Sequence, residues 1–213
     1  MLRIVQGFLG KFFQPGGAGS LKDKIRRVMA VYRALDKEAV RFKVSCGLAC
    51  PDQCGECCFS SNVEATELEM LPLAWDLVRL GKADEWYDRA REMNFEGRCV
   101  FYSSDNSRGC CRSYVFRPLV CRLFGYAGSK DKHEHLRLVT CKVLKKVWPQ
   151  EVEQVLDKVG KGRLHPPLMM DFVMRVAGID PDMTRDSLPV NQAFKKAVER
   201  VYVYQKFNTM RRG

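Results

Sequence analysis

The feature of the sequence that most constrains the fold is the cysteine run CPDQCGECC at residues 50–58. It places four thiols within nine residues and ends in the vicinal pair Cys57–Cys58. Such a run is typical either of disulfide cross-links or of metal ligands, and the redox compartment decides between the two. Hydrophobic residues make up 46% of the 213 residues, so the chain can bury a core without disulfides.

The first 19 residues bear on the compartment. Their apolar stretch resembles a signal peptide, but Gln6 interrupts it, Lys11 closes it, and no small-residue cleavage site follows. We interpret residues 1–19 as a retained amphipathic, flexible segment that contacts a membrane or a partner, or packs on its own domain. No apolar run reaches the roughly 18 residues of a transmembrane helix. We therefore expect a cytoplasmic protein, in which clustered cysteines indicate metal or redox chemistry.

The net charge of +11 is unevenly distributed. Residues 1–45 carry +7, residues 46–145 are neutral, and residues 146–213 carry +4, while all ten cysteines lie in the neutral part. We expect a cysteine-cluster domain over 20–145 that begins with a basic helix. A basic helical extension over 146–213 packs on the same domain.

The hydrophobic pattern predicts a mainly α-helical fold with a small irregular β element, the helices being packed around a cysteine-rich metal-binding core. Ser20 caps the first helix and the sequence TELE at 66–69 is a capping box, with Thr66 as N-cap. Gly, Pro and Cys are too dense over 46–58 for regular structure, and two short extended pieces lie within 98–118. The predicted helices cover 21–43, 66–80, 83–94, 150–160, 167–177 and 190–208, with a helical turn near 118–126 and a strand at 134–139.

The spacing of the cysteines favours metal binding. A C-x-x-C turn such as Cys54 to Cys57 lets two sulfurs converge on one ion, and Gly55 within it tolerates any φ. Neighbouring cysteines normally splay apart, so the pair Cys57–Cys58 fits two metals or a polynuclear cluster better than one tetrahedral ion. Five thiols in thirteen residues are unlike the isolated buried cysteine of an ordinary core.

Several of these blocks together resemble one known family. CGECC at 54–58, RCVF at 98–101 and CRSYVFRPLVCRLF at 111–124 are similar to the YkgJ-like cysteine-cluster proteins of the CxxCxxCC type, which are described as zinc- or iron-chelating domains. The resemblance covers residues 46–125, and Cys50 departs from the family spacing by one position. Cys46, Cys110 and Cys141 have no counterpart in the matched blocks.

The resemblance implies a set of metal ligands. The cysteines that match the family pattern are Cys54, Cys57, Cys58, Cys99, Cys111 and Cys121, and Cys50 is a seventh candidate. We expect Arg117 and Arg122 to lie beside the thiolates, because four thiolates around a divalent ion leave a charge of about −2 that guanidinium groups stabilise. His133 and His135 are further candidates, since alternate residues of a strand face one side.

All-sulfur ligation favours zinc or iron–sulfur chemistry over magnesium or calcium. More than four candidate ligands and the vicinal pair shift the preference slightly toward an iron–sulfur cluster or iron, with zinc as the alternative.

Three function classes fit the sequence. The first is a metal-binding protein with a redox, metal-handling or enzyme-supporting role, acting with a protein partner that the sequence does not identify. The second is a metalloenzyme, because flagellin lysine methylases contain a similar cluster. The third is a zinc-stabilised nucleic-acid-binding module, suggested only by the basic flanks and lacking any known binding motif.

Overall fold

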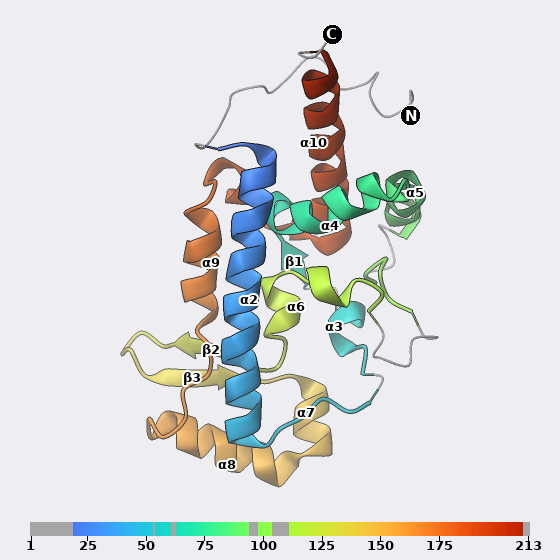
Figure 1. The fold of residues 1–213 in the computed structure, drawn as a ribbon. Helices are drawn as coiled ribbons and strands as arrows, with labels where there is room; N and C mark the ends of the chain where they lie inside the picture. Colours follow the sequence, from blue (N-terminus) through green and yellow to red (C-terminus); the bar gives the residue numbers. More distant parts are fainter. Residues whose placement is uncertain (1–18, 53, 61–62, 94–97, 104–110, 211–213) are drawn as a thin grey trace.

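The computed structural model of the protein describes residues 19–52, 54–60, 63–93, 98–103 and 111–210. Over these residues the fold is mainly α-helical with small two-stranded sheets, which confirms the predicted fold class (Figure 1). The helices are α2 (Leu21–Cys46), α3 (Glu56–Phe59), α4 (Glu67–Arg79), α5 (Ala83–Glu92), η2 (Tyr114–Phe116), α6 (Leu119–Arg122), α7 (Lys142–Val147), α8 (Pro149–Gly160), α9 (Met169–Ala177), η3 (Asp182–Thr184) and α10 (Val190–Met210).

Helix α2 runs through the middle of the molecule beside α9, and its C-terminal end meets α8 (Figure 1). The Ser20 side chain accepts a hydrogen bond from the Asp23 N–H at 3.2 Å, which confirms the predicted cap. The helix extends to Cys46, further than the sequence predicted, because Gly47 ends it with a left-handed φ of 72° that closes a bond to the Lys43 carbonyl.

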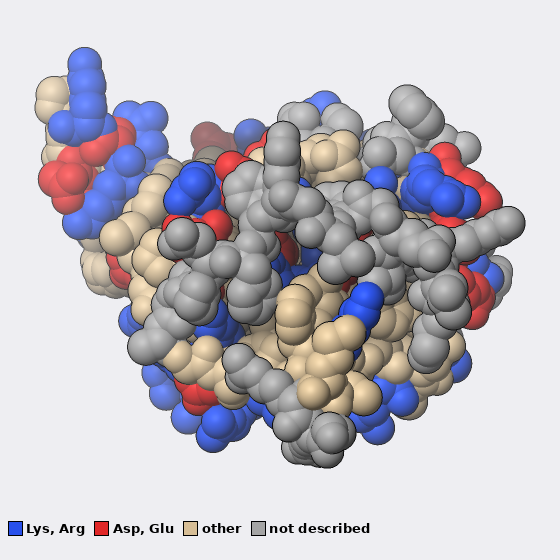
Figure 2. Space-filling model, turned by 90° about the horizontal axis from the view of Figure 1, so that it is seen from above, with Lys and Arg blue, Asp and Glu red and all other residues tan. Residues whose placement is uncertain are grey.

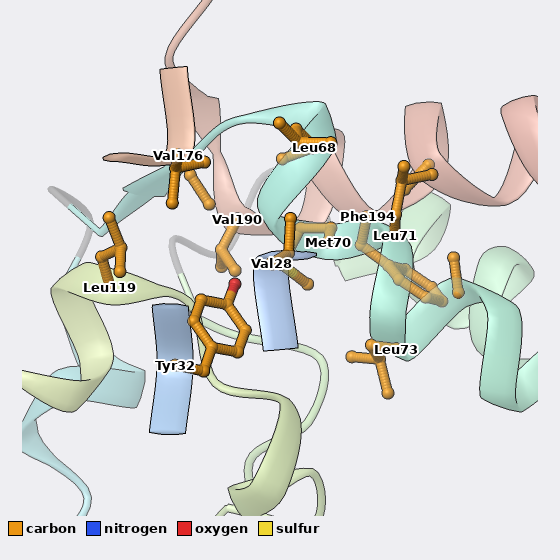
Figure 3. Packing of buried hydrophobic residues seen from close by; sticks show 14 of the residues in the cluster. Val28, Tyr32, Leu68, Met70, Leu71, Leu73, Leu119, Val176, Val190 and Phe194 are labelled. Carbon is orange, nitrogen blue, oxygen red and sulfur yellow. The ribbon is translucent and has the colours of Figure 1, made fainter. Parts of the chain in front are cut away.

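The main core forms between α2, α4 and α10. Figure 3 shows Val28 and Tyr32 of α2 facing Leu68 and Met70 of α4, with Phe194 of α10 close by. The α4 capping box predicted from TELE is present, with both reciprocal bonds between Thr66 and Glu69. The Tyr32 hydroxyl donates to the Glu69 backbone carbonyl at 2.7 Å and so fixes α2 against the first turn of α4.

Two short antiparallel pairs make up the β structure of the described residues: β1 (Glu64–Ala65) with β4 (Leu188–Pro189), and β2 (Ala127–Lys130) with β3 (Leu136–Val139). The strand predicted at 134–139 corresponds to β3, which starts two residues later because His133 and His135 form the turn. Their backbone N–H groups donate to the Asp131 carboxylate at 2.8 and 3.0 Å.

A second, smaller core lies between the end of α2, β3 and α8 (Figure 1). It includes Phe42, Leu48, Tyr126, Leu138, Leu144, Val152, Val155 and Val159. Sequence periodicity did not predict α7, whose six residues are shorter than two helical turns and give little pattern.

Some predictions fall outside the described residues. They are the N-terminal segment 1–18 and the turn residues Asp105, Asn106 and Gly109. Within the described part of the chain, no helix combines the length and the apolar character needed to cross a membrane.

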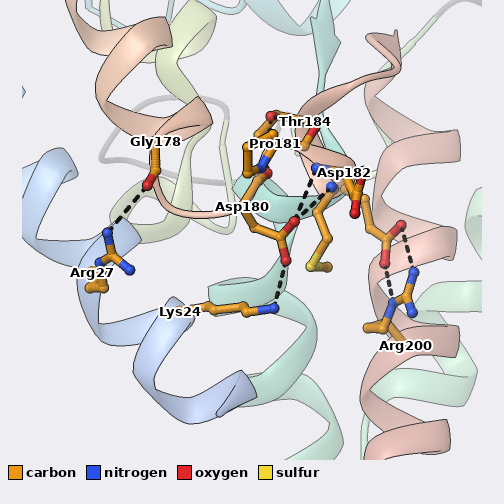
Figure 4. A network of polar contacts seen from close by, with 10 residues as sticks. Lys24, Arg27, Gly178, Asp180, Pro181, Asp182, Thr184 and Arg200 are labelled. Carbon is orange, nitrogen blue, oxygen red and sulfur yellow. Dashed lines mark hydrogen bonds and ion pairs between the residues drawn. The ribbon is translucent and has the colours of Figure 1, made fainter. Parts of the chain in front are cut away.

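A buried ion pair ties α2 to the segment after α9. The Lys24 ammonium lies 2.6 Å from the Asp180 carboxylate, whose side chain is 1% exposed, and the other carboxylate oxygen accepts the N–H groups of Asp182 and Met183 (Figure 4). Arg27 donates to the Gly178 carbonyl in the same network. Because each Asp180 oxygen has a donor, the buried charge is satisfied.

We therefore expect Lys24→Met to destabilise the protein by about 3–5 kcal/mol, since it leaves the Asp180 charge buried and unpaired. The matched control is Arg26→Met on the same helix, which removes an exposed ion pair with Asp23 and should cost less than about 1 kcal/mol. Urea unfolding of both variants measures the difference. Equal losses would contradict the role of the Lys24–Asp180 pair.

Candidate metal centre

Five thiols line one small cavity of about 20 Å³. They come from segments that are distant in sequence: α3, the turn-containing stretch 98–103, residue 111 three positions before η2, and α6. The five are Cys57, Cys58, Cys99, Cys111 and Cys121. Met70 and Leu73 of α4 and Val190 of α10 close the cavity, so it lies at the edge of the main core.

Both members of the vicinal pair face this cavity, whereas the sequence led us to expect them to splay apart. The reason is that residues 56–59 form a helical turn rather than the irregular structure predicted for 46–58. Gly55 caps the turn and its carbonyl accepts the Cys58 N–H at 2.7 Å. The Cys58 carbonyl in turn accepts the Cys99 N–H at 2.9 Å, which brings a third thiol to the pair.

Asn191 of α10 holds the stretch that carries Cys99. Its side-chain oxygen accepts the Val100 N–H at 2.9 Å and its amide donates to the Arg98 carbonyl at 2.8 Å. Further along, an isolated antiparallel bridge joins Tyr102 to Cys111. Sequence analysis did not identify Asn191, because a single polar residue in a helical pattern gives no sign of its distant partners.

The carboxylate of Glu69 holds the segment that carries Cys121. One oxygen accepts the N–H and the hydroxyl of Thr66, and the other accepts the Leu119 N–H at 3.0 Å at the start of α6. Burial raises the pKa of the Glu69 carboxyl, although the bonds from Thr66 and Leu119 oppose that shift. The capping box was predicted, but its bond to α6 was not, since it joins residues fifty positions apart.

The thiols differ in acidity because they share hydrogen bonds. The bond from Cys58 lowers the pKa of Cys57 and of Cys111 to about 7, and the positive charge of Arg117 also lowers both. The hydrogen bonds of Cys58 with Cys111, Cys57 and Cys99 raise its own pKa, and the bond with Cys111 has the largest effect. Burial raises the pKa of Cys121. The cavity thus contains two acidic thiols beside a thiol held protonated.

The structure gives the two predicted arginines different surroundings. Arg117 lines the cavity and stacks on the Tyr114 ring at 3.6 Å, and its buried Nε has no hydrogen-bond partner among the described residues. Arg122 is 4% exposed and does not line the cavity. Its guanidinium pairs with Asp36 and donates to the carbonyls of Val115 and Arg117, so it holds the chain around Arg117 in place.

Cys50 and Cys54, two of the predicted ligands, do not line the cavity. Burial raises the pKa of the Cys54 thiol, and the charges of Cys50, Cys141 and Cys57 raise it further. His133 and His135 lie in the exposed turn between β2 and β3 and do not line the cavity either. Within the described ranges no three His, Cys, Asp or Glu side chains form a ready coordination sphere, so binding an ion requires the thiols to turn inward.

The donor set fits a metal ion nonetheless. Thiols that hydrogen-bond one another need only small rotations to converge on an ion at about 2.3 Å. The unpartnered Nε of Arg117 is a donor available for thiolates, which accept hydrogen bonds from neighbouring groups in metal sites.

The pKa values of the cavity thiols predict the order in which they react with iodoacetamide in the reduced, chelator-treated protein. Because only the thiolate reacts, labelling of Cys57 and Cys111 should rise as the pH increases through about 7, below the usual thiol pKa of about 8.5. Cys58 should react last. Peptide mass spectrometry over a pH series measures the order, and early labelling of Cys58 would refute it.

Loss of the two Asn191 hydrogen bonds should make Cys99 more accessible to solvent. Asn191→Ala leaves the Val100 N–H and the Arg98 carbonyl without their partner, and the loss at the buried Val100 N–H alone costs about 1–3 kcal/mol. We also expect faster labelling of Cys99. Asn208→Ala on the same helix is the control, because it removes only a local bond to the Tyr204 carbonyl. Equal effects of the two substitutions would show that the Asn191 bonds do not hold the stretch that carries Cys99.

Comparison with known protein families gives a match to part of the chain. Residues 49–142 match the model of the family CxxCxxCC, described as "Putative zinc- or iron-chelating domain", over less than half of the chain. Searches of the curated proteins and of the solved structures give no match. All five cavity thiols lie within the matched residues, as do Cys50, Cys54 and Cys141, whereas Cys46 precedes them. Residues 49–142 are therefore similar to the zinc- or iron-chelating domain of the CxxCxxCC type, which supports metal binding through cysteine ligands.

Proposed function

We propose that the protein binds a zinc or iron ion through the thiols of the cavity, with Cys57, Cys99, Cys111 and Cys121 as the principal ligands and Cys58 as an exchangeable fifth. The observation that carries the proposal is the convergence of these thiols from four separate segments on one cavity. A stable core of ordinary cysteines gives no reason for five sulfurs to meet in one place.

The charges of the site support this assignment. Four thiolates around a divalent ion carry about −2, which is costly in a half-buried position unless cations lie nearby. Arg117 supplies one positive charge inside the cavity and Arg122 fixes its backbone through the Arg117 carbonyl at 2.7 Å. The low pKa values of Cys57 and Cys111 also reduce the cost of releasing their protons to the solvent when the ion binds.

The volume of the cavity bears on the kind of metal. About 20 Å³ is roughly the room that one water molecule needs, so a single ion fits with less rearrangement than a cluster. The sequence preference for an iron–sulfur cluster rested on the surplus of candidate ligands over four and on the vicinal pair, which was expected to splay apart. In the structure both thiols of the pair face the same cavity. We therefore favour a mononuclear site, and an iron–sulfur cluster is the alternative to be tested.

Such a site links metal binding to folding. The ion would join α3, the stretch at 98–103, Cys111 and α6, and so add to the bonds that already link them, such as Cys99 N–H to the Cys58 carbonyl. Binding would thus stabilise the irregular centre of the molecule, as in other small metal domains.

A metalloenzyme is a second candidate, favoured by a groove of about 630 Å³ beside the cavity. The groove shares Leu73, Cys111, Ser113 and Phe116 with the cavity, and Trp86 also lines it. Substrate bound there would approach the ion from the side of Cys111. The cobalt-substituted protein tests this idea: azide should change its visible spectrum if a coordination position is open, and no change would exclude the enzyme hypothesis.

The face seen in Figure 2 offers less support for nucleic-acid binding. On its described residues, Lys and Arg side chains are interspersed with Asp and Glu side chains. A phosphate-binding surface would gather the positive side chains in a stripe or patch.

We expect Cys57→Ser and Cys121→Ser each to remove the ion of this centre from anaerobically purified protein. Each variant should also melt several degrees lower, since about 1 kcal/mol corresponds to roughly 2–4 °C for a chain of this size. The matched control is Cys141→Ser, which removes a half-buried thiol that does not line the cavity and should leave this ion bound.

Elemental analysis and absorption spectra measure the outcome. A colourless protein with zinc, or iron with thiolate charge-transfer bands, supports a mononuclear site. A broad absorption band at the violet end of the visible spectrum, together with acid-labile sulfide, would establish an iron–sulfur cluster instead. Unchanged metal content in both cavity variants would remove the basis of the proposal.

A further inference from the structure

The groove beside the cavity is larger than a metal centre needs. Its volume of about 630 Å³ lies within the range of roughly 300–1,000 Å³ that is typical of binding pockets, whereas the cavity has about 20 Å³. Helix η2 packs against α4, and α5 follows α4 after a short turn, so three parts of the chain form the walls of the groove (Figure 1). We therefore ask which kind of ligand these walls fit.

The lining of the groove is largely apolar, and part of it is open to solvent. Leu77 of α4 and Phe116 of η2 line it, together with Leu80, Tyr114 and Val115. The last three are 49%, 53% and 65% exposed. Single exposed apolar side chains are ordinary on a protein surface, but several that share one groove with a polar rim are typical of a surface that binds another protein.

Two aromatic rings of the lining are held in place by their neighbours. The Trp86 ring stacks on Phe101 with the ring centroids 4.9 Å apart, and Phe101 in turn packs edge-on against Phe194 of α10. The Arg117 guanidinium lies 3.6 Å from the centre of the Tyr114 ring. Rings that are fixed before binding lose little conformational entropy when a ligand arrives, and Trp and Tyr are prominent among the residues that dominate interface energies.

The charged residues of the groove favour an acidic ligand. Lys82 and Arg112 line it, and Asp76 is the acidic residue of the lining. The Asp76 carboxylate is paired with Arg79 at 2.7 Å, so its charge is compensated. Within the ranges that the structure describes, the Lys82 ammonium has no ion-pair partner. Carboxylates of a ligand would thus meet complementary charge at this rim, whereas a basic ligand would be repelled.

We propose that the groove is the docking site for an acidic segment of a partner protein. The segment inserts an apolar side chain against Trp86 and Tyr114, and its carboxylates lie beside Lys82 and Arg112. The open rim favours a segment of a protein over a small molecule, because pockets for small molecules enclose most of the ligand surface. Cys111 lines both the groove and the cavity, so the docked segment lies next to the metal centre. The groove is formed without an ion, and the proposal therefore does not rest on the proposed function.

Selection of a random nonapeptide phage library on the full-length, reduced protein tests the proposal, followed by fluorescence anisotropy with synthetic copies of the enriched peptides. We expect these peptides to combine a large apolar residue with several Asp or Glu. Their affinity should fall as the salt concentration rises, because salt screens the charges at the exposed rim. Binding is expected in chelator-treated and in zinc-loaded protein, so failure of the metal assignment would leave this result unchanged.

Two substitutions at exposed positions show whether the peptides bind in the groove. Val115→Asp places a carboxylate in the apolar lining and should lower the peptide affinity by about tenfold or more, and Lys82→Glu should lower it about fivefold. The matched controls are Val44→Asp on α2 and Lys145→Glu on α7, which change exposed residues that do not line the groove and should leave the affinity unchanged.

Unchanged affinity in both groove variants would refute the proposal, as would a selection that enriches basic peptides or none. Peptide binding that appears only after deletion of residues 1–18 would assign the groove to that segment of the chain. A dimer that Val115→Asp abolishes would assign it to a second copy of the chain. Either assignment would overturn docking of a partner protein. Thermal melting shows whether each variant is folded, and one folded groove variant is enough for the decision.

Discussion

The arrangement of the molecule depends on one buried carboxylate. Glu69 accepts three hydrogen bonds, two from Thr66 at the start of α4 and one from Leu119 at the start of α6. Its side chain therefore belongs at once to the helix that forms the main core and to the segment that presents Cys121. Because a buried carboxylate without donors is costly, the three donors must be placed together. This requirement fixes the position of α6, which presents Cys121 to the cavity, relative to the main core.

Much of the fold could be predicted because its signals are local. Ser20 and Thr66 begin their helices where a cap was expected, and Gly81 follows α4 with a left-handed φ of 68°. The errors also have local causes. The helical turn at 56–59 was missed because the density of Gly, Pro and Cys suggested irregular structure, yet the carbonyl of Gly55 can accept two N–H bonds and start a turn.

The candidate site was less predictable because its support comes from distant residues. The cysteines were evident from their spacing, but which of them line the cavity was not. Asn191, which carries no motif, holds the stretch of Cys99 from α10. The Tyr126 hydroxyl lies 3.6 Å from the sulfur of Cys50, which does not line the cavity. Such contacts are set by packing, which a one-dimensional pattern does not contain.

The position of the cavity has a physical consequence for folding. The main core forms between α2, α4 and α10, and the cavity lies at its edge. An ion in the cavity would attach irregular chain to a core that hydrophobic burial already stabilises. Metal there would fix α3 and α6 against this core. The second core, between the end of α2, β3 and α8, includes none of the five cavity thiols, so its stability would depend on hydrophobic burial rather than on the ion.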